Sequence, residues 1–183
     1  MDQTAITPLN QTARIVLGMI AEGHTTGYAI KAEIERSTRL YWGASIGGIY
    51  PELRRLTDAG LISGRDDPRG ESVRHCYEIT DDGRTALRAW LTDPCAPAIE
   101  HRDEALLQLR FAGVLAREDR LEVIRRKHAV HELRVKELEA LLEADEFDDP
   151  FHRLAVEFGL GWNRWACDWC EQTERRLARD PSH

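Results

Sequence analysis

Two pairs of residues in the chain have the types and spacing of metal or redox chemistry. Cys167 and Cys170 lie in the order Cys-Asp-Trp-Cys, a spacing that can hold zinc or cycle between thiol and disulfide. The pattern places them in the middle of a helix, where nothing evident lowers a thiol pKa, and no second such pair accompanies them. His128 and His131 could chelate a metal from one helix face, but no carboxylate stands at a compelling position for a further ligand. We expect packing roles for the cysteines, with a redox- or metal-responsive role as the alternative. The histidines are expected to form a buried or half-exposed pair at a helix interface.

The sequence lacks the motifs that catalysis usually requires. It has no phosphate-cradling glycine loop, no nucleophile elbow and no zinc-protease helix motif. Its Asp and Glu residues are scattered along helical patterns, as is typical of solvated faces. We predict that the chain is not an enzyme and that it needs neither a metal nor a cofactor.

A stretch of glycine, tyrosine and arginine residues suits a different chemistry. It begins at Gly47 and reads GGIYPELRRLTDAGLI. Apolar residues recur at helical spacing from the residue just before it and form one stripe: Ile46, Ile49, Leu53 and Leu56. Pro51 falls on the opposite face, where the loss of its amide and a modest bend of the helix are tolerable. That outer face is smooth at its start and cationic further along, so it can approach another molecule closely.

The start of this helix supplies most of the candidate DNA contacts. Free amides at a helix N-terminus can bind phosphate oxygens, and glycines remove the bulk that would block the approach. Tyr50 and Arg54 can contact a phosphate or a base edge, whereas Arg55 is equally suited to pair with a carboxylate. The full set of predicted DNA contacts is Lys31, Ser45, Gly47, Gly48, Tyr50, Arg54, Arg55, Arg69 and Arg74.

Several of these residues have a second interpretation. Arg69 and Arg74 would add salt-dependent phosphate contacts, but local pairing with Asp67 or Glu71 is as plausible from the sequence. Lys31 is a further phosphate candidate, although a lone surface lysine usually serves solubility. We expect Tyr28, in the same predicted helix, to be a core or docking residue.

The elements that position these residues follow from the apolar periodicity. Helices are predicted at residues 10–22, at Gly27–Thr38 with Thr26 as its cap, from Ser45 to a C-cap at Gly60, and from Thr80 or Asp81 to Leu91; strands are predicted at Leu61–Arg65 and Val73–Ile79. Three helices, a β-hairpin and a fourth helix form the order of a winged helix-turn-helix. In that fold the third helix recognises DNA and the hairpin is the wing.

A second, helical part follows the proline-containing linker Thr92–Ala98. Helices are predicted at His101–Ala116, Glu118–Ala144 and Phe151–Ala178. In the middle one, apolar residues and both histidines recur at alternating spacings of three and four, which predicts a packing seam within the chain or across a dimer. We therefore predict a mostly α protein with a winged helix-turn-helix DNA-binding domain at 10–92 and an α-helical dimerisation and effector domain at 99–179.

The last helix has an aromatic face formed by Phe158, Trp162, Trp165 and Trp169. Large aromatic side chains at helical spacing usually pack in a core or an interface. The alternative is a gap near the dimer seam, lined by Trp162, Trp165 and Trp169, that binds a flat, small hydrophobic or aromatic effector.

The overall charge is compatible with DNA binding. The net charge is −7, but residues 1–92 have 11 Lys and Arg against 12 Asp and Glu, so most of the acidity lies in the second half. DNA binding depends on the local field of one face. The short apolar patch Ile15–Ala21 is neither a signal peptide nor a membrane span, and sparse cysteines favour a reducing compartment. We expect a cytoplasmic protein with no membrane partner.

Taken together, the motifs resemble the PadR family of transcriptional regulators, in the subfamily whose long helical C-terminal region is like that of virulence-gene activators. The stretches that carry the resemblance span residues 14–177: GYAIKAEIE, SIGGIYPELRRLTDAGLI, CYEITDDGRTALRAWL, RDEALLQLRF and RLAVEFGLGWNRWACDW. The resemblance implies a homodimeric winged-helix repressor that binds an inverted-repeat operator and is relieved in some members by a small molecule. The wing departs from the basic wings of the family, because acidic residues dilute its arginines. A winged-helix module that binds protein instead of DNA is the remaining alternative.

Overall fold

The computed structural model describes residues 9–38, 48–68, 74–94 and 103–179, and the chain divides into two compact units, Met1–Pro97 and Ala98–His183. The first unit contains α1 (Gln11–Ala21), α2 (Gly27–Glu33), the π-helical turn η1 (Ile34–Thr38), α4 (Ile49–Asp58), β1 (Ile62–Asp67), β2 (Arg74–Ile79) and α5 (Asp81–Leu91). The second contains α6 (Glu104–Phe111), the 3₁₀ turn η3 (Ala112–Val114), α7 (Arg117–Ala144) and α8 (Pro150–Arg179). The predicted fold class, a winged helix-turn-helix followed by a helical region, is confirmed.

Side chains predicted from the sequence cap the helices of the first unit. The Thr26 hydroxyl accepts a hydrogen bond from the Ala29 amide at 3.1 Å, and Thr80 accepts one from Gly83 at 3.1 Å. These bonds satisfy amides that have no partner within the helix. One apolar core then joins the helices and the hairpin; its buried members are Leu9, Ala13, Val16, Leu17, Met19, Ile20, Ile30, Ile34, Ile49, Leu53, Leu56, Ile62 and Ala86.

The recognition helix α4 starts later than expected, which changes the interpretation of its proline. The helix begins at Ile49, with Gly48 as its N-cap, so Pro51 is its third residue. An amide in the first turn has no partner within the helix, and proline there costs little. No bend is needed to explain it. The part of the predicted helix before Gly48, including Ile46, lies outside the described residues.

The end of α4 is the predicted glycine cap. Gly60 has a φ of 71°, its amide donates to Thr57 O at 2.9 Å, and the Leu61 amide donates to Leu56 O at 2.9 Å. This pair of bonds is a Schellman motif, which requires a left-handed residue at the position of Gly60.

The wing is an antiparallel hairpin in which Ile62 pairs with Ile79 and Asp67 with Arg74. It is fixed to the helices at two places. The Tyr77 amide donates to Thr25 O at 2.7 Å, in the turn before α2. A Cβ atom at Gly83, in α5, would lie 2.0 Å from Leu61 O, so only glycine allows α5 to approach the start of β1 this closely. The wing therefore has a fixed position relative to α2 and α5.

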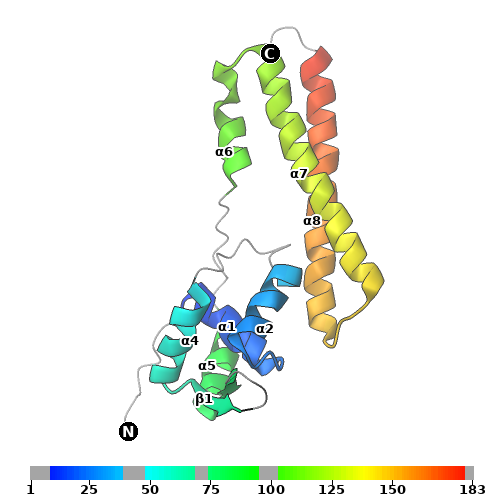
Figure 1. The fold of residues 1–183 in the computed structure, drawn as a ribbon. Helices are drawn as coiled ribbons and strands as arrows, with labels where there is room; N and C mark the ends of the chain where they lie inside the picture. The colour runs from blue at the N-terminus through cyan, green and yellow to red at the C-terminus, as the bar shows by residue number, and fades with distance from the viewer. Residues whose placement is uncertain (1–8, 39–47, 69–73, 95–102, 180–183) are drawn as a thin grey trace. The chain divides into compact units, whose positions relative to one another are not determined.

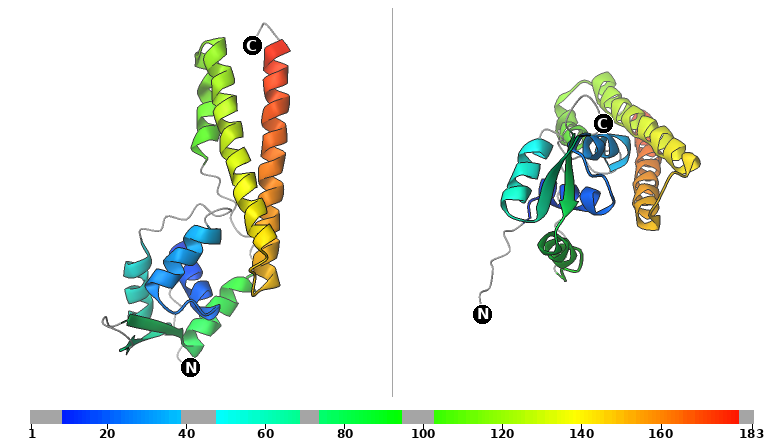
Figure 2. Two further views of the ribbon diagram at one scale, coloured as in Figure 1. Left: turned by 45° about the vertical axis from the view of Figure 1, so that its right-hand side comes forward. Right: turned by 60° about the horizontal axis from the view of Figure 1, so that its bottom comes forward.

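In the second unit, α7 and α8 lie side by side in opposite directions (Figures 1 and 2). Ile124 and Leu138 from the predicted seam of α7 are buried. His131 Nδ1 lies 2.8 Å from Asn163 Oδ1, and the Asn163 amide group donates to Gly159 O at 2.8 Å. The seam thus joins α7 to α8 within one chain, which was one of its two predicted roles.

The aromatic face of α8 is not a core of the chain. Phe158, Trp162 and Trp165 are 78%, 43% and 54% exposed. The buried face of α8 consists of smaller side chains, among them Val156, Gly159, Leu160, Asn163, Ala166 and Cys170. The interpretation of the aromatic face as an intramolecular core is therefore wrong.

The first predicted helix of this unit, His101–Ala116, extends too far at its C-terminal end. In the structure α6 ends at Phe111, and a 3₁₀ turn begins at Ala112. Among the described residues, no helix is long and apolar enough to cross a membrane.

Candidate nucleic-acid interface

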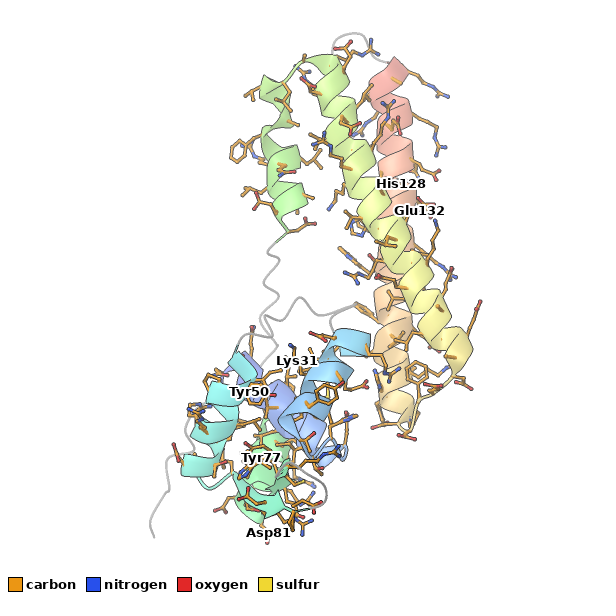
Figure 3. All side chains as sticks on the ribbon, viewed as in Figure 1. Lys31, Tyr50, Tyr77, Asp81, His128 and Glu132 are labelled. Carbon is orange, nitrogen blue, oxygen red and sulfur yellow. The ribbon has the colours of Figure 1, made fainter. Side chains whose placement is uncertain are left out.

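The start of α4 lies directly against the start of α2, and Gly27 makes this possible. A Cβ atom on Gly27 would lie 2.7 Å from Tyr50 Cε1 and 3.3 Å from Leu53 Cδ1. The Tyr50 ring therefore lies over the first residue of α2, on the side of α4 that faces this helix (Figure 3). Tyr50 is still 56% exposed, so it is held in place by one side of its ring while the rest faces solvent. A side chain in this state is preorganised for contact with another molecule.

The two arginines of α4 have different environments. Arg55 Nη2 lies 2.6 Å from Glu52 Oε1, and Glu52, only 7% exposed, also accepts a bond from the Asn10 side chain at 3.3 Å. The hydrogen bond to Glu52 raises the pKa of Arg55, against the effect of burial. Of the two roles predicted for Arg55, the structure shows pairing with a carboxylate, where it neutralises a buried charge.

Arg54 is exposed, and it has no hydrogen bond or ion pair with any residue that the structure describes. It lies near Tyr77 of the wing: burial raises the pKa of Tyr77, the Arg54 charge lowers it, and Tyr50 raises it. Tyr77 thus keeps its proton at neutral pH and can donate a hydrogen bond beside a cation. Arg54, Tyr50 and Tyr77 bring one positive charge and two hydroxyl donors to the junction of α4 and the wing.

Sequence reasoning missed two tyrosines of this surface. Tyr77 was placed in the predicted strand Val73–Ile79 and in a stretch that carries the family resemblance, but it was not assigned a DNA contact. Its neighbours Arg54 and Tyr50 lie in α4, twenty-three and twenty-seven positions earlier in the chain. Tyr28 was expected to be a core or docking residue; at 79% exposed it is not part of the core, so the docking role remains. It precedes Lys31 by three positions on α2, which places both on one helix face. Ile30 and Ile34 are buried and so mark the core-facing side of this helix. Their spacing from Tyr28 and Lys31 was the sequence signal that could have placed Tyr28 on the exposed side.

The remaining predicted contacts are divided between the wing and α2. Lys31 is exposed and lies 3.8 Å from Glu35, a surface pair that contributes little to stability. Arg74 is opposite Asp67 in the hairpin register but forms no ion pair within the described part of the chain. Gly48 is the N-cap of α4 and has no side-chain cap bond. Three predicted contacts, Ser45, Gly47 and Arg69, lie outside the described residues.

The wing itself is close to neutral. Arg65 pairs with Glu78 at 2.9 Å, and His75 Nδ1 lies 2.6 Å from Asp66 Oδ1. These acidic partners cancel part of the positive charge that a wing would offer to phosphates. Recognition would consequently depend more on α2 and α4 than on the hairpin.

The cysteines of α8 have the environment of packing residues. Burial is the main cause that raises the pKa of both Cys167 and Cys170, with nearby acidic groups adding to the effect at Cys167. Thiols in this state stay protonated and react slowly. Among the residues described, no three His, Cys, Asp or Glu side chains form a group that could hold a metal ion. The environment of the cysteines therefore does not favour the redox- or metal-responsive alternative.

Of the three tryptophans predicted to bind an effector, Trp162 and Trp165 have their rings in contact. The Trp162 and Trp165 rings are 5.0 Å apart between centroids with an interplanar angle of 33°. Trp169 is half-buried. The first two form a tilted, partly exposed aromatic pair on α8.

Comparison with known proteins identifies both units. Residues 16–89 match the transcriptional regulator PadR-like family, and residues 101–178 match the C-terminal region of virulence activator alpha. The chain belongs to the PadR-like family of transcriptional regulators. Its two matched regions follow each other in the order that the sequence motifs indicated, and the predicted resemblance is confirmed. Relatives in this family are regulators and not enzymes.

Individual relatives agree along almost the whole chain. The negative transcriptional regulator PadR of Bacillus subtilis is 28% identical over 177 residues, which cover 90% of this chain and 96% of that protein. Crystal structures of Bacillus subtilis PadR with operator DNA and with p-coumaric acid have TM-scores of 0.81 and 0.75, at 24% and 23% identity; each covers 92% of this chain, and the alignments span 99% and 100% of those chains. The Vibrio cholerae virulence activator AphA has a TM-score of 0.69 at 23% identity and covers 92% of this chain and 98% of its own. These PadR-like structures share the fold of this chain.

Proposed function

We propose that this PadR-family regulator binds an inverted-repeat operator as a homodimer and represses transcription. The observation that carries the proposal is the exposed surface at the start of α4. There Tyr50 and Arg54, which has no ion-pair partner among the described residues, lie beside Tyr77 of the wing. Hydroxyl and guanidinium donors of this kind bind phosphate oxygens and base edges. The operator-bound structure of Bacillus subtilis PadR supports the assignment by analogy of fold.

The contacts divide into two classes. Arg54, at the exposed side of α4, is the candidate for a base edge in the major groove. Tyr28, Lys31 and Arg74 are candidates for the phosphate backbone, together with the α4 amides that Gly48 leaves uncovered. Because the first 92 residues are almost neutral in total, we expect few phosphate contacts per subunit and a binding constant that depends on salt through those few.

The second unit supports self-association. Apolar side chains that the single chain leaves exposed gather on α6 and α8: Leu106, Leu107, Phe111, Phe151, Leu154, Phe158, Trp162 and Trp165. Exposed apolar surface of this extent is unfavourable in a monomer and marks an interaction site. A second copy of the chain is the partner we propose. Two recognition helices would then enter successive major grooves about 34–36 Å apart.

We infer that a small hydrophobic or aromatic effector relieves repression. The tilted Trp162–Trp165 pair offers a flat ring a stacking surface, and Trp169 extends it along the helix. A crystal structure of Bacillus subtilis PadR contains p-coumaric acid, an aromatic acid. An effector bound at the dimer surface would act by favouring a spacing of the recognition helices that does not fit the operator. We place the protein in the cytoplasm, with the DNA that it regulates.

The experiment that tests the proposal combines the selection of genomic DNA fragments by the protein with a measurement of the protein's mass in solution. Purified protein is incubated with sheared DNA of its own genome, and the retained fragments are sequenced and footprinted. We expect enrichment of a discrete inverted repeat and a light-scattering mass of two chains. A protein that remains monomeric and enriches no sequence at low salt would refute the proposal. The same result would favour a winged-helix module that binds protein.

A further inference from the structure

A buried lysine links the first helix of the second unit to α7. The Lys127 side chain is 9% exposed, and its Nζ lies 2.6 Å from Oδ2 of Asp103. A buried ammonium group is strongly unfavourable without a charged partner. Among the described residues, Asp103 is the carboxylate that forms an ion pair with it. Lys127 therefore holds Asp103 close to α7.

The same carboxylate starts α6. Its other oxygen, Oδ1, accepts a hydrogen bond from the Leu106 amide at 3.0 Å, and the Asp103 carbonyl accepts one from Leu107 at 3.0 Å. Both oxygens are thus used, one for the N-cap of α6 and one for the attachment to α7. The first turn of α6 is fixed in direction as well as in position.

Among the described residues, few other contacts hold α6 to its unit. It has eight residues, and none of them is buried. Helices of this length are not stable alone, and most draw their stability from a packed apolar face. Only Ala105 and Leu109 are half-buried. The Asp103–Lys127 ion pair therefore adds a charged contact at the start of α6 to the limited apolar packing between α6 and α7.

The place of Asp103 along the chain gives this contact its importance. The first unit ends at Pro97 and the second begins at Ala98, so the chain from the DNA-binding unit enters the helical unit within a few residues of Asp103. Any motion of the first turn of α6 moves the point at which a DNA-binding unit is attached. In a dimer, two such attachment points determine how well both units reach their half-sites together.

We propose that Asp103 and Lys127 form a latch that positions the attachment point of each DNA-binding unit, so that both half-sites of an operator are bound at once. The proposal rests on the operator-binding dimer proposed above. The latch raises the effective concentration of the second DNA-binding unit at its half-site after the first has bound. It contributes nothing to the contacts within one half-site.

The decisive variant is Lys127→Met, which removes the ion pair, keeps the Asp103 cap and has a similar volume. Its matched control is Lys136→Met, on the same helix, where the lysine is exposed and pairs with Glu132 at 3.2 Å. Affinity is measured by anisotropy for the full inverted repeat and for a duplex with one half-site. We expect Lys127→Met to lose roughly tenfold or more on the repeat and to bind the half-site within about twofold of the original protein. Lys136→Met should match the original protein on both duplexes.

A second variant keeps the test valid if Lys127→Met folds poorly. Asp103→Ser retains a capping oxygen but cannot reach Lys127, and the same loss on the repeat is expected. Hydrogen exchange of the α6 amides should accelerate in both variants and not in Lys136→Met.

Unchanged affinity for the repeat, or an equal loss on both duplexes, would overturn the latch. If the original protein bound no operator, the proposed function would fail instead, and the exchange of α6 would still report on the latch.

Discussion

The adjacent arginines of α4 allow a direct test of which side chain recognises DNA. Arg54 has no partner within the described structure, whereas Arg55 neutralises Glu52, which is 7% exposed. Replacing Arg54 with alanine should remove one DNA contact per half-site, about 1–3 kcal/mol each. Across two half-sites this is a loss of roughly 30-fold or more in operator affinity. Because the side chain is exposed and has no partner in the described part of the chain, the free energy of unfolding should change by less than about 0.5 kcal/mol.

The matched variant Arg55→Ala should show the opposite pattern. It leaves the Glu52 carboxylate buried with only the Asn10 amide group as a described side-chain partner. Removal of one partner from a buried pair costs about 3–5 kcal/mol, and we expect about 1–2 kcal/mol here because the arginine is 36% exposed and screened by solvent. Operator affinity, measured where both variants are folded, should fall much less than for Arg54→Ala.

Two measurements on each variant distinguish a DNA-contact role from a structural role for the two arginines. Urea unfolding gives the free energy of unfolding, and fluorescence anisotropy at several salt concentrations gives operator affinity. If Arg54 contacts a phosphate, the salt dependence should also weaken, by about one counterion per half-site. Loss of affinity confined to Arg55→Ala at unchanged stability would show that the two roles are reversed.

Three further perturbations test other parts of the structure. Gly83→Ala places a Cβ atom 2.0 Å from Leu61 O and should lower the free energy of unfolding by about 2–3 kcal/mol in urea titrations; an unchanged midpoint would contradict the close approach. The pKa values of Cys167 and Cys170 are raised above the ordinary 9.0, so alkylation at pH 8 should be slower than for free cysteine; rapid labelling of the native protein would revive the redox alternative. Burial raises the pKa of Asp103, but the ion pair with Lys127 and the backbone hydrogen bonds outweigh that effect and lower the pKa below 3.8. The ionised carboxylate therefore stabilises the fold above pH 3.8, and this contribution is lost as the pH falls through the lowered pKa. The difference in unfolding free energy between the original protein and Asp103→Ser should therefore shrink below pH 4, and a difference that does not depend on pH would count against the charged pair.

The sequence alone determined the order of the elements and most of their boundaries in the DNA-binding unit. Caps such as Thr26, Thr80 and Gly60 act within one turn of chain, and their hydrogen bonds are the ones that the local pattern predicts. Apolar spacing likewise depends only on helical geometry. The family motifs are combinations of such local features, which is why they were recognisable before any contact was known.

Only the tertiary structure decided which charged and aromatic side chains are free to act. The partner of Arg55 is near in sequence, but Glu52 is buried because of the elements packed around it. Lys127 pairs with Asp103, which lies twenty-four positions away in the chain, and Tyr77 of β2 interacts electrostatically with Arg54 and Tyr50 of α4. The aromatic face of α8 is exposed because smaller residues on the opposite face suit close packing with α7. A sequence pattern states that a face is apolar or charged, but the packing of distant elements decides whether that face is covered.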